Sequence, residues 1–350
     1  MFDHKTAPSS EQLMARMRLH DDQALRKHRS AVRKMLDSFA RAEGQLERWR
    51  CEWPPRAREL RFVPNATATG TFWEKHLSSG RQTIVVCNEL LFFQNPKSSM
   101  VVRFPDINAE DRNDKRGHLA EFMRLHGDAV KDPEAYVPEF LYLSAGEIKA
   151  AESIGQWFGS HAVHASAPMR ISESLKDEEF LRSAPVLVGT IRTSRFIRRF
   201  LSAADCPPFR YRIAPDKLNE CEIRQISEHE RAELIKRGVS VDATDSDVRL
   251  AMHNTMGYSY GIVYRMPLPD SAGVPLTIIA STSYVAHAQI AKALTDEEVL
   301  GASFKALGWD PQNTLSATFE WLFALKMEPG GMVYRHGNAI LIGGHTIEGY

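Results

Sequence analysis

The stretches that decide the fold are TIVVCNE at 83–89, FLYLSAGE at 140–147, PVLVGTIRTS at 185–194 and PLTIIASTSY at 275–284. In each, a β-type apolar run is followed by a turn of small or hydroxyl residues and then by a helical pattern. Repeated units of this kind are typical of an α/β fold with a mostly parallel sheet.

The positions of the predicted strands follow from these runs. The segment YSYGIVYRMPLPDSAGVPLTIIAST, which begins at residue 258, predicts an antiparallel hairpin whose turn is PDSAG. Two further apolar runs, WLFALKM and NAILIGG, lie near the carboxyl terminus. We expect the four strands at the following positions to lie parallel and adjacent: 83–87, 140–143, 185–188 and 276–280.

A long helix is predicted ahead of the sheet, in a first segment at 1–55. Residues 9–50 contain no proline. Within them, apolar side chains recur every seven residues, which is the pattern of a coiled coil. Such a seam supports self-association into a homo-oligomer, or it packs on the protein's own α/β region. The seam consists of Leu25, Val32, Phe39 and Leu46.

The rest of the chain divides by composition. Residues 54–70 contain three prolines and end in the small residues NATATG, and the segment 56–70 is predicted to form a linker. Two α/β halves follow, at 71–170 and 171–350, and the pattern leaves open whether they are separate half-domains or parts of one sheet. The three segments are therefore expected to be a helix, a linker and an α/β region.

Composition excludes several classes of protein. The chain has 350 residues, is 43% hydrophobic and carries 44 basic and 44 acidic side chains, so its net charge is zero. A neutral chain gives no support to a general nucleic-acid or membrane-surface binder. No apolar run approaches the roughly 20 residues of a membrane span. We expect a soluble, cytoplasmic protein.

The cysteines and histidines indicate neither a disulfide framework nor a metal site. The four cysteines are scattered and show no CxxC spacing, and His161 and His164 have no further ligands nearby. P-loop, GxGxxG, GxSxG and HExxH motifs are all absent. We therefore predict no cofactor and no metal, and no motif names a reaction.

A ligand-binding pocket is predicted where the turns follow the strands. Parallel α/β sheets bind ligands beyond the carboxyl ends of their strands, where helix N-termini favour anions. Two arginines at such a helix start favour an anionic ligand, unless an acidic side chain from elsewhere neutralises them. The hydroxyl residues also serve as ordinary helix caps. The candidate ligand-binding residues are Ser144, Gly189, Thr190, Arg192, Thr193, Ser194, Arg195, Ser281, Thr282 and Ser283.

Two carboxylates are candidates for catalysis. Glu147 and Glu89 occupy comparable places in LSAGE and VCNE, and a pair of carboxylates facing one pocket can act as acid and base or as nucleophile and acid. The alternative for Glu147 is structural, because Ser144 and Glu147 have the spacing of a capping box.

The order of motifs is similar to that of an uncharacterised group of bacterial α/β domains. The motifs are FWEKHL, TIVVC, YLSAGEIKAAESIGQWF, LRSAPVLVGTIRTSRFIRRF and TIIASTSYVAHAQIAKAL, which together span about 71–330. Members of the group carry this region behind a DNA-binding or membrane-anchoring segment, which implies a sensory or regulatory role. This chain departs from that pattern, because a predicted helix replaces either segment and the GTIRTS turn lacks asparagine.

Three functions follow from these observations. The first is a regulatory sensor that binds a small anionic, nucleotide-like molecule. The second is a hydrolase or transferase acting on a nucleotide or N-glycoside through Glu147. The third is a structural or interaction protein without a small ligand. Whether the chain is an enzyme stays open at this point.

Overall fold

The computed structural model of the chain divides into two compact units, residues 1–74 and 75–350. In the first unit, strand β1 (Trp49–Glu52) pairs antiparallel with β2 (Arg61–Pro64), and helix α3 (Ala68–Ser78) begins near its end. The structure describes residues 30, 34, 49–52, 61–64, 67–97, 100–103, 135–161, 166–190, 194–213, 220–239, 241, 246–251, 257–271, 273–283, 285–308, 318–328 and 335–347.

The predicted helix at 9–50 lies mostly outside the described residues, and so does its heptad seam. Ser30 and Lys34 are helical, whereas Trp49 and Arg50 belong to strand β1. The end of the helix was therefore predicted wrongly, because these residues pair with β2 across an antiparallel ladder. The predicted coiled coil and the self-association that depends on it stay predictions.

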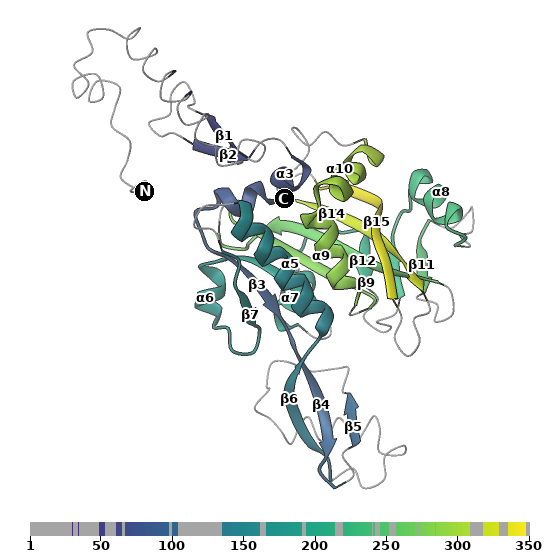
Figure 1. Ribbon diagram of the computed structural model, residues 1–350. Coiled ribbons are helices and arrows are strands. Elements are labelled where there is room, and N and C mark those ends of the chain that lie inside the picture. Colours follow the sequence, from purple (N-terminus) through teal and green to yellow (C-terminus); the bar gives the residue numbers. More distant parts are fainter. Residues whose placement is uncertain are drawn as a thin grey trace, which may run out of the picture. The chain divides into compact units, whose positions relative to one another are not determined.

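A seven-stranded mixed sheet forms the centre of the second unit (Figure 1). It draws strands from both predicted halves, 71–170 and 171–350, so these halves share one sheet. The strands, in their order across the sheet, are β15 (Arg335–Thr346), β14 (Phe319–Glu328), β12 (Tyr258–Pro267), β13 (Pro275–Ser281), β8 (Ala184–Gly189), β3 (Thr83–Cys87) and β7 (Met169–Ile171).

The parallel part of this sheet agrees with three of the four predicted strands. Strand β8 lies between β3 and β13 and pairs parallel with both, and β7 pairs parallel with β3. All residues of β3, β8 and β13 are buried, as the continuous apolar runs of strands covered on both faces require. The predicted hairpin is confirmed, since β12 and β13 pair antiparallel from Pro267 and Pro275 onward.

The fourth predicted strand, 140–143, is not in the central sheet. It belongs to β6 (Val137–Leu143), which pairs antiparallel with β4 (Glu89–Asn95) in a separate three-stranded sheet completed by β5 (Met100–Arg103). The chain leaves β3 through Asn88 directly into β4, and it returns along β6 into α5 (Figure 1). The apolar run FLYL gave no sign that its partner is the neighbouring ELLFF rather than a strand of the main sheet.

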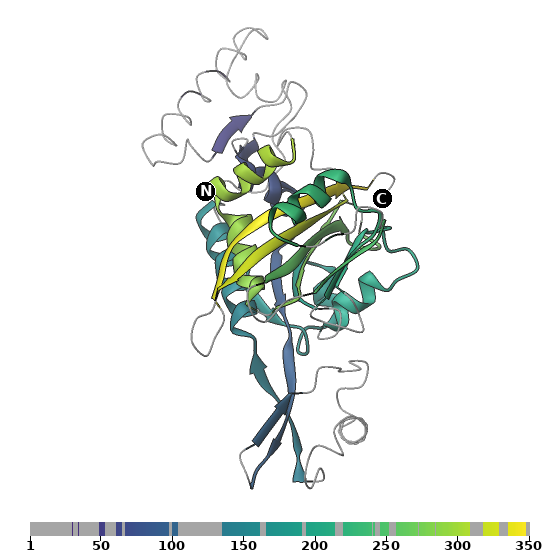
Figure 2. The same cartoon turned by 90° about the vertical axis from the view of Figure 1, so that its right-hand side faces the viewer.

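Two layers cover the central sheet (Figure 2). On one face lie α5 (Ala145–His161), α9 (Ala286–Thr295) and α10 (Glu297–Ala306). On the other face, α6 (Asp177–Leu181) and α7 (Arg195–Leu201) pack into one hydrophobic core with alternate residues of the strands. That core includes Ile84, Val86, Leu187, Ile262, Ile278, Phe180, Phe196 and Phe200.

A small antiparallel sheet extends the second layer. Its strands are β9 (Tyr211–Ile213), β10 (Glu220–Ile223) and β11 (Val248–Ala251), and helix α8 (Glu228–Lys236) lies between β10 and β11 in the sequence. The side chains of Tyr211, Cys221 and Leu234 are buried in the same core as the central sheet. This sheet therefore brings α8 close to strand β15 at the edge of the central sheet.

Candidate functional site

The carboxyl end of β8 is the point where the predicted turns meet. The turns after β3, β8 and β13 lie side by side, because these three strands are adjacent and parallel. The next helices after β3 and β13 are α5 and α9, which contact each other on one face, whereas α7 follows β8 on the opposite face. Neighbouring strands whose helices lie on opposite faces define the switch point at which open α/β sheets bind ligands.

Asn88 connects β3 to β8 at this switch point. It is fully buried, its Nδ2 donates to the carbonyl oxygen of Val188 at 2.6 Å, and its backbone N–H donates to Oε2 of Glu147 at 2.9 Å. The Oδ1 atom of Asn88 is buried and has no hydrogen-bond partner in the described part of the chain. An unsatisfied buried acceptor costs about 1–3 kcal/mol, which a ligand hydroxyl or amine would recover by donating to it.

Glu147 and Ser144 reach the same edge through helix α5. Glu147 is fully buried in the first turn of α5, where its carboxylate accepts the N–H of Asn88. Ser144 is buried directly ahead of the helix. Glu89 opens β4, and its side chain lies outside the described residues. The pairing of Glu147 with Glu89 therefore stays a prediction.

Gly189, Thr190 and His287 form the middle of the edge. Gly189 has a φ of 150°, a region that L side chains rarely adopt. Thr190 is buried, and its carbonyl accepts the N–H of Ser194 at 3.0 Å. His287, in the first turn of α9, donates from Nε2 to the Gly189 carbonyl at 3.3 Å. Burial lowers the pKa of His287 to about 4, so the ring is neutral at pH 7.

The hydroxyls of Ser281 and Thr282, at the end of β13, have hydrogen-bond partners within the protein. Ser281 donates from Oγ to the carbonyl of Ser283 at 2.5 Å. The Oγ1 of Thr282 accepts the N–H of Tyr260 at 3.0 Å and lies 3.2 Å from the carbonyl of the same residue. These hydrogen bonds fix the end of β13 against β12, so they account for both hydroxyls without a ligand.

The arginine-rich start of α7 is partly explained by internal contacts. Ser194 caps the helix, because its side chain accepts a backbone N–H of the first turn at 3.2 Å. Arg195 NH2 lies 3.5 Å from a carboxylate oxygen of Asp177. This contact agrees with the alternative in which an acidic side chain from elsewhere neutralises the helix start. Arg192 and Thr193 lie outside the described residues.

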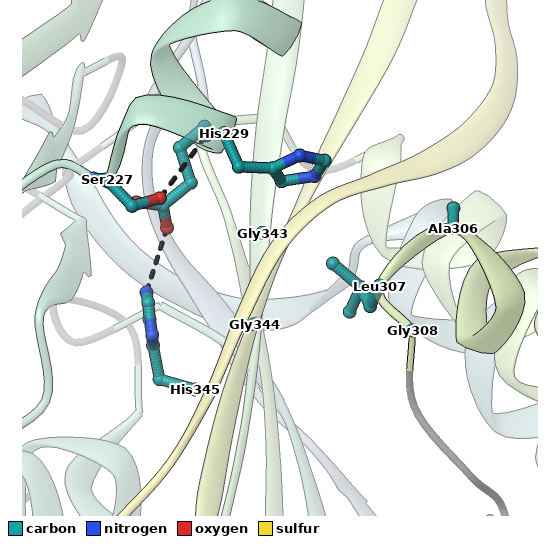
Figure 3. A pocket seen from close by; sticks show the side chains of 9 residues that line it. Ser227, His229, Ala306, Leu307, Gly308, Gly343, Gly344 and His345 are labelled. Atoms are coloured by element: carbon teal, nitrogen blue, oxygen red, sulfur yellow. Dashed lines mark hydrogen bonds and ion pairs between the residues drawn. The ribbon is translucent and has the colours of Figure 1, made fainter.

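A cleft of about 350 Å³ lies at β15, away from the switch point (Figure 3). Nε2 of His345 lies 2.9 Å from Oε1 of Glu230. The close-up shows Leu307 projecting toward the β15 backbone from the side opposite Ser227 and His229. The cleft is lined by Ser227, His229 and Glu230 of the α8 region, by residues 306–308 at the end of α10, and by Gly343, Gly344 and His345 of β15.

Glu230 is the buried anion of this cleft. Its carboxylate accepts hydrogen bonds from the hydroxyl of Tyr211, from Nε2 of His345 at 2.9 Å, and from the N–H and the hydroxyl of Ser227, each at 2.7 Å. Burial opposes the ionisation of Glu230, but these hydrogen bonds outweigh it and hold its pKa at about 2. The predicted capping box of Ser227 and Glu230 is present.

Glu320 lies behind the same cluster. It is fully buried on β14, opposite His345, and accepts the backbone N–H of Arg210 at 2.8 Å and that of Tyr211 at 2.9 Å. Burial raises the pKa of Glu320 to about 7. An NH1 nitrogen of Arg210 lies 3.0 Å from Nδ1 of His345. The same NH1 lies 2.9 Å from Nε2 of His345, so the guanidinium packs against both ring nitrogens.

Several residues at the switch point and in the cleft were not predicted from the sequence. Asn88 stands directly after a buried strand, and His287 stands in the first turn after the last parallel strand, so the same positional rule applies to both. No such rule predicts the cluster at the cleft, since Arg210 and His345 are 135 residues apart in the sequence. Only the tertiary structure brings such residues together.

Comparison with known proteins adds no relative. Among the described residues, no cluster of three or more His, Cys, Asp or Glu side chains is arranged to hold a metal ion. No helix in the described part of the chain is long and apolar enough to cross a membrane. No family model matches the chain, and neither a curated protein nor a solved structure matches it.

Proposed function

We propose that the protein is a regulatory module that binds a small anionic, nucleotide-like molecule at the carboxyl ends of β3, β8 and β13. The observation that carries the proposal is the fully buried Oδ1 of Asn88, which has no hydrogen-bond partner among the described residues and lies at the switch point of the sheet. A ligand hydroxyl, such as that of a ribose, is a donor suited to this acceptor.

The surroundings of Asn88 supply the second half of the argument. Two helices, α5 and α9, begin at this edge, and the positive ends of their dipoles favour a negatively charged group. Gly189, which lies between them, has no side chain and adopts a backbone conformation that suits glycine. A molecule with both hydroxyls and an anionic group fits this combination, and the resemblance to sensory domains supports a regulatory role.

A thermal-shift measurement with AMP, ATP, GTP, cyclic AMP and NAD tests the proposal. A nucleotide at about 100 times its Kd stabilises the folded state by about 2.7 kcal/mol, which corresponds to about 5 °C in Tm. We expect the ligand-induced shift to shrink in Asn88→Ser and in Arg192→Ala. The control Lys236→Ala, on the exposed end of α8, should keep the full shift. A shift that survives in both site variants would place the ligand elsewhere.

An enzymatic function is the second proposal, because Glu147 is a fully buried carboxylate at the same edge. In this alternative, Glu147 acts as nucleophile or base on a bound nucleotide or N-glycoside. Product formation that disappears in Glu147→Gln, while the thermal shift remains, supports the enzyme. A protein that shows neither a thermal shift nor turnover with these nucleotides would contradict both proposals. The third alternative, a structural or interaction protein without a small ligand, would then remain.

A further inference from the structure

The end of strand β8 is flanked by two buried side chains that hydrogen-bond consecutive carbonyl groups. Nδ2 of Asn88 donates to the carbonyl of Val188 at 2.6 Å, and Nε2 of His287 lies 3.3 Å from the carbonyl of Gly189. Both side chains are fully buried. Because the Cα atoms of consecutive residues are only about 3.8 Å apart, the amide of Asn88 and the first turn of α9 lie close together at the end of β8.

The helices that begin at this edge differ in what occupies their N-terminal ends. Helix α5 has the carboxylate of Glu147 in its first turn. Helix α7 has only seven residues and is capped by the side chain of Ser194. Helix α9 has ten residues and no acidic residue in its first turn, and Val285, the residue ahead of it, makes no side-chain cap hydrogen bond. Among the described helices of this edge, α9 is therefore the one whose positive end is not matched by a side chain.

Two observations at the start of α9 point to a ligand that carries a hydrogen-bond donor next to an anion. Val285 is 40% exposed, so the N-terminus of α9 reaches the surface. His287 is neutral at pH 7, because burial lowers its pKa to about 4, and it adds no charge to the helix end. The buried Oδ1 of Asn88 has no hydrogen-bond partner in the described part of the chain. A hydroxyl group satisfies this acceptor, and an anion satisfies the helix end.

The charge of this edge suits one anionic group rather than several. The carboxylate of Glu147 lies 2.9 Å from the backbone nitrogen of Asn88 and repels additional negative charge. The guanidinium of Arg195, at the start of α7, lies 3.5 Å from a carboxylate oxygen of Asp177 and donates to the carbonyl of Leu175 at 2.6 Å. P-loop sites for triphosphates supply a lysine and a magnesium ligand through a GxxxxGK[ST] motif, which this sequence lacks.

We propose that the site takes a nucleoside monophosphate, with its single phosphate at the N-terminus of α9 and a ribose hydroxyl on Oδ1 of Asn88. This inference rests on the proposed function and narrows it from nucleotides in general to one class. In a nucleoside 5′-monophosphate, one sugar ring carries both the hydroxyls and the phosphate, so the two groups are close enough for neighbouring subsites. Phosphate at a helix N-terminus is a recurrent arrangement, because the dipole and the backbone N–H groups both favour it.

Calorimetric titration of the full chain without magnesium tests the ligand class. The panel contains AMP, GMP, CMP and UMP, their di- and triphosphates, and ribose 5-phosphate. We expect at least one monophosphate to bind about tenfold more tightly than the triphosphate of the same base, because the additional charges face Glu147. The 2′,3′-dideoxy form of that monophosphate should bind about tenfold more weakly, since it leaves the acceptor of Asn88 unsatisfied.

Val285→Asp tests the position of the phosphate. A carboxylate at this residue caps α9 and takes the place of the phosphate, so the Tm of the ligand-free protein should rise while the monophosphate binds about tenfold more weakly. A loss of binding in a stabilised variant does not come from unfolding. Val285→Asn, which has the same shape without the charge, should weaken binding less. The control Ile340→Asp, which adds the same charge at an exposed position of β15, should bind as the wild type does.

The possible contrary results separate this inference from the proposed function. Equal affinities for the monophosphate and the triphosphate would overturn it, and so would equal affinities for the ribose and dideoxyribose forms. The same holds if Val285→Asp binds the monophosphate as tightly as the wild type does. Each of these results leaves a nucleotide site in the protein. Ribose 5-phosphate that binds as tightly as the monophosphate would overturn the nucleoside and assign the site to a sugar phosphate. Absence of binding by every nucleotide would overturn both proposals.

Discussion

The buried carboxyl of Glu320 makes a quantitative prediction about stability and pH. Burial raises the pKa of Glu320 from 4.5 to about 7 in the folded protein, although backbone N–H groups of Tyr211 and Arg210 lower it. This difference of about 2.5 pKa units corresponds to about 3 kcal/mol between the two protonation states, at 1.36 kcal/mol per unit. The ionised form of this carboxyl is therefore costly in the folded state.

The direction of the effect follows from which state holds the proton. Below pH 4.5 the carboxyl is protonated in both states, so it contributes no pH dependence. Between pH 4.5 and 7 the unfolded chain loses this proton while the folded protein keeps it, so the free energy of unfolding falls as the pH rises. Above pH 7 both states are ionised, and the full cost of about 3 kcal/mol remains.

Glu320→Gln should remove this cost, because the amide resembles the protonated carboxyl in shape and carries no charge. Urea unfolding of both proteins at pH 5, 6, 7 and 8 measures the difference. We expect the stability of Glu320→Gln relative to the wild type to increase by up to about 3 kcal/mol across this range. Other groups, such as Glu230 and His287, titrate in both proteins and largely cancel in the difference.

The control is Glu298→Gln, at an exposed position of α10. Its stability should follow the wild type at every pH. Parallel pH profiles for Glu320→Gln and the wild type would refute the reasoning, since they would mean that Glu320 has the same pKa in the folded and unfolded states. A profile of opposite slope would mean that the hydrogen bonds from the backbone of Arg210 and Tyr211 outweigh the burial of this carboxyl.

Two further predictions concern a close approach and the N-terminal segment. Gly343→Ala should lower the free energy of unfolding by about 1–3 kcal/mol, because its Cβ would meet polar side-chain oxygens at 2.5 and 2.7 Å. The control is Gly337→Ala, whose Cβ would meet its nearest neighbours at 3.6 and 3.8 Å, and it should change the urea midpoint little. Removal of residues 1–55 should convert an oligomer into a monomer by light scattering, and a truncated chain that keeps the oligomeric state of the full chain would contradict the predicted seam.

The sequence was sufficient for the parallel centre of the fold. Runs such as TIVVC and PVLVG are apolar throughout, and strands buried on both faces need that composition. It was insufficient for 140–143, because FLYL has the same composition while its pairing depends on β4, which is some fifty residues away in the sequence. Strand pairing at that range depends on the competition among several apolar runs, which periodicity does not resolve.

The candidate site divides in the same way. A positional rule led to Gly189, Thr190 and Glu147, because turns after parallel strands share one edge. The role of Asn88 could be predicted only with knowledge of which strands are neighbours, since it depends on the contact with Val188 across the sheet. The residues around Glu230 come from three separate elements, β9, α8 and β15, and only the capping box with Ser227 leaves a local pattern.

The excursion between β3 and α5 has a consequence for how this architecture tolerates change. Glu89 and Leu143 are cross-strand partners, so the chain returns next to the point where it left. An insertion whose two ends are neighbours closes its own loop, and further lengthening adds only about 0.6 kcal/mol of closure entropy per doubling. Homologous chains can therefore differ by dozens of residues at this point, or replace the ribbon with a short turn, while the register of β3, β8 and β13 is preserved.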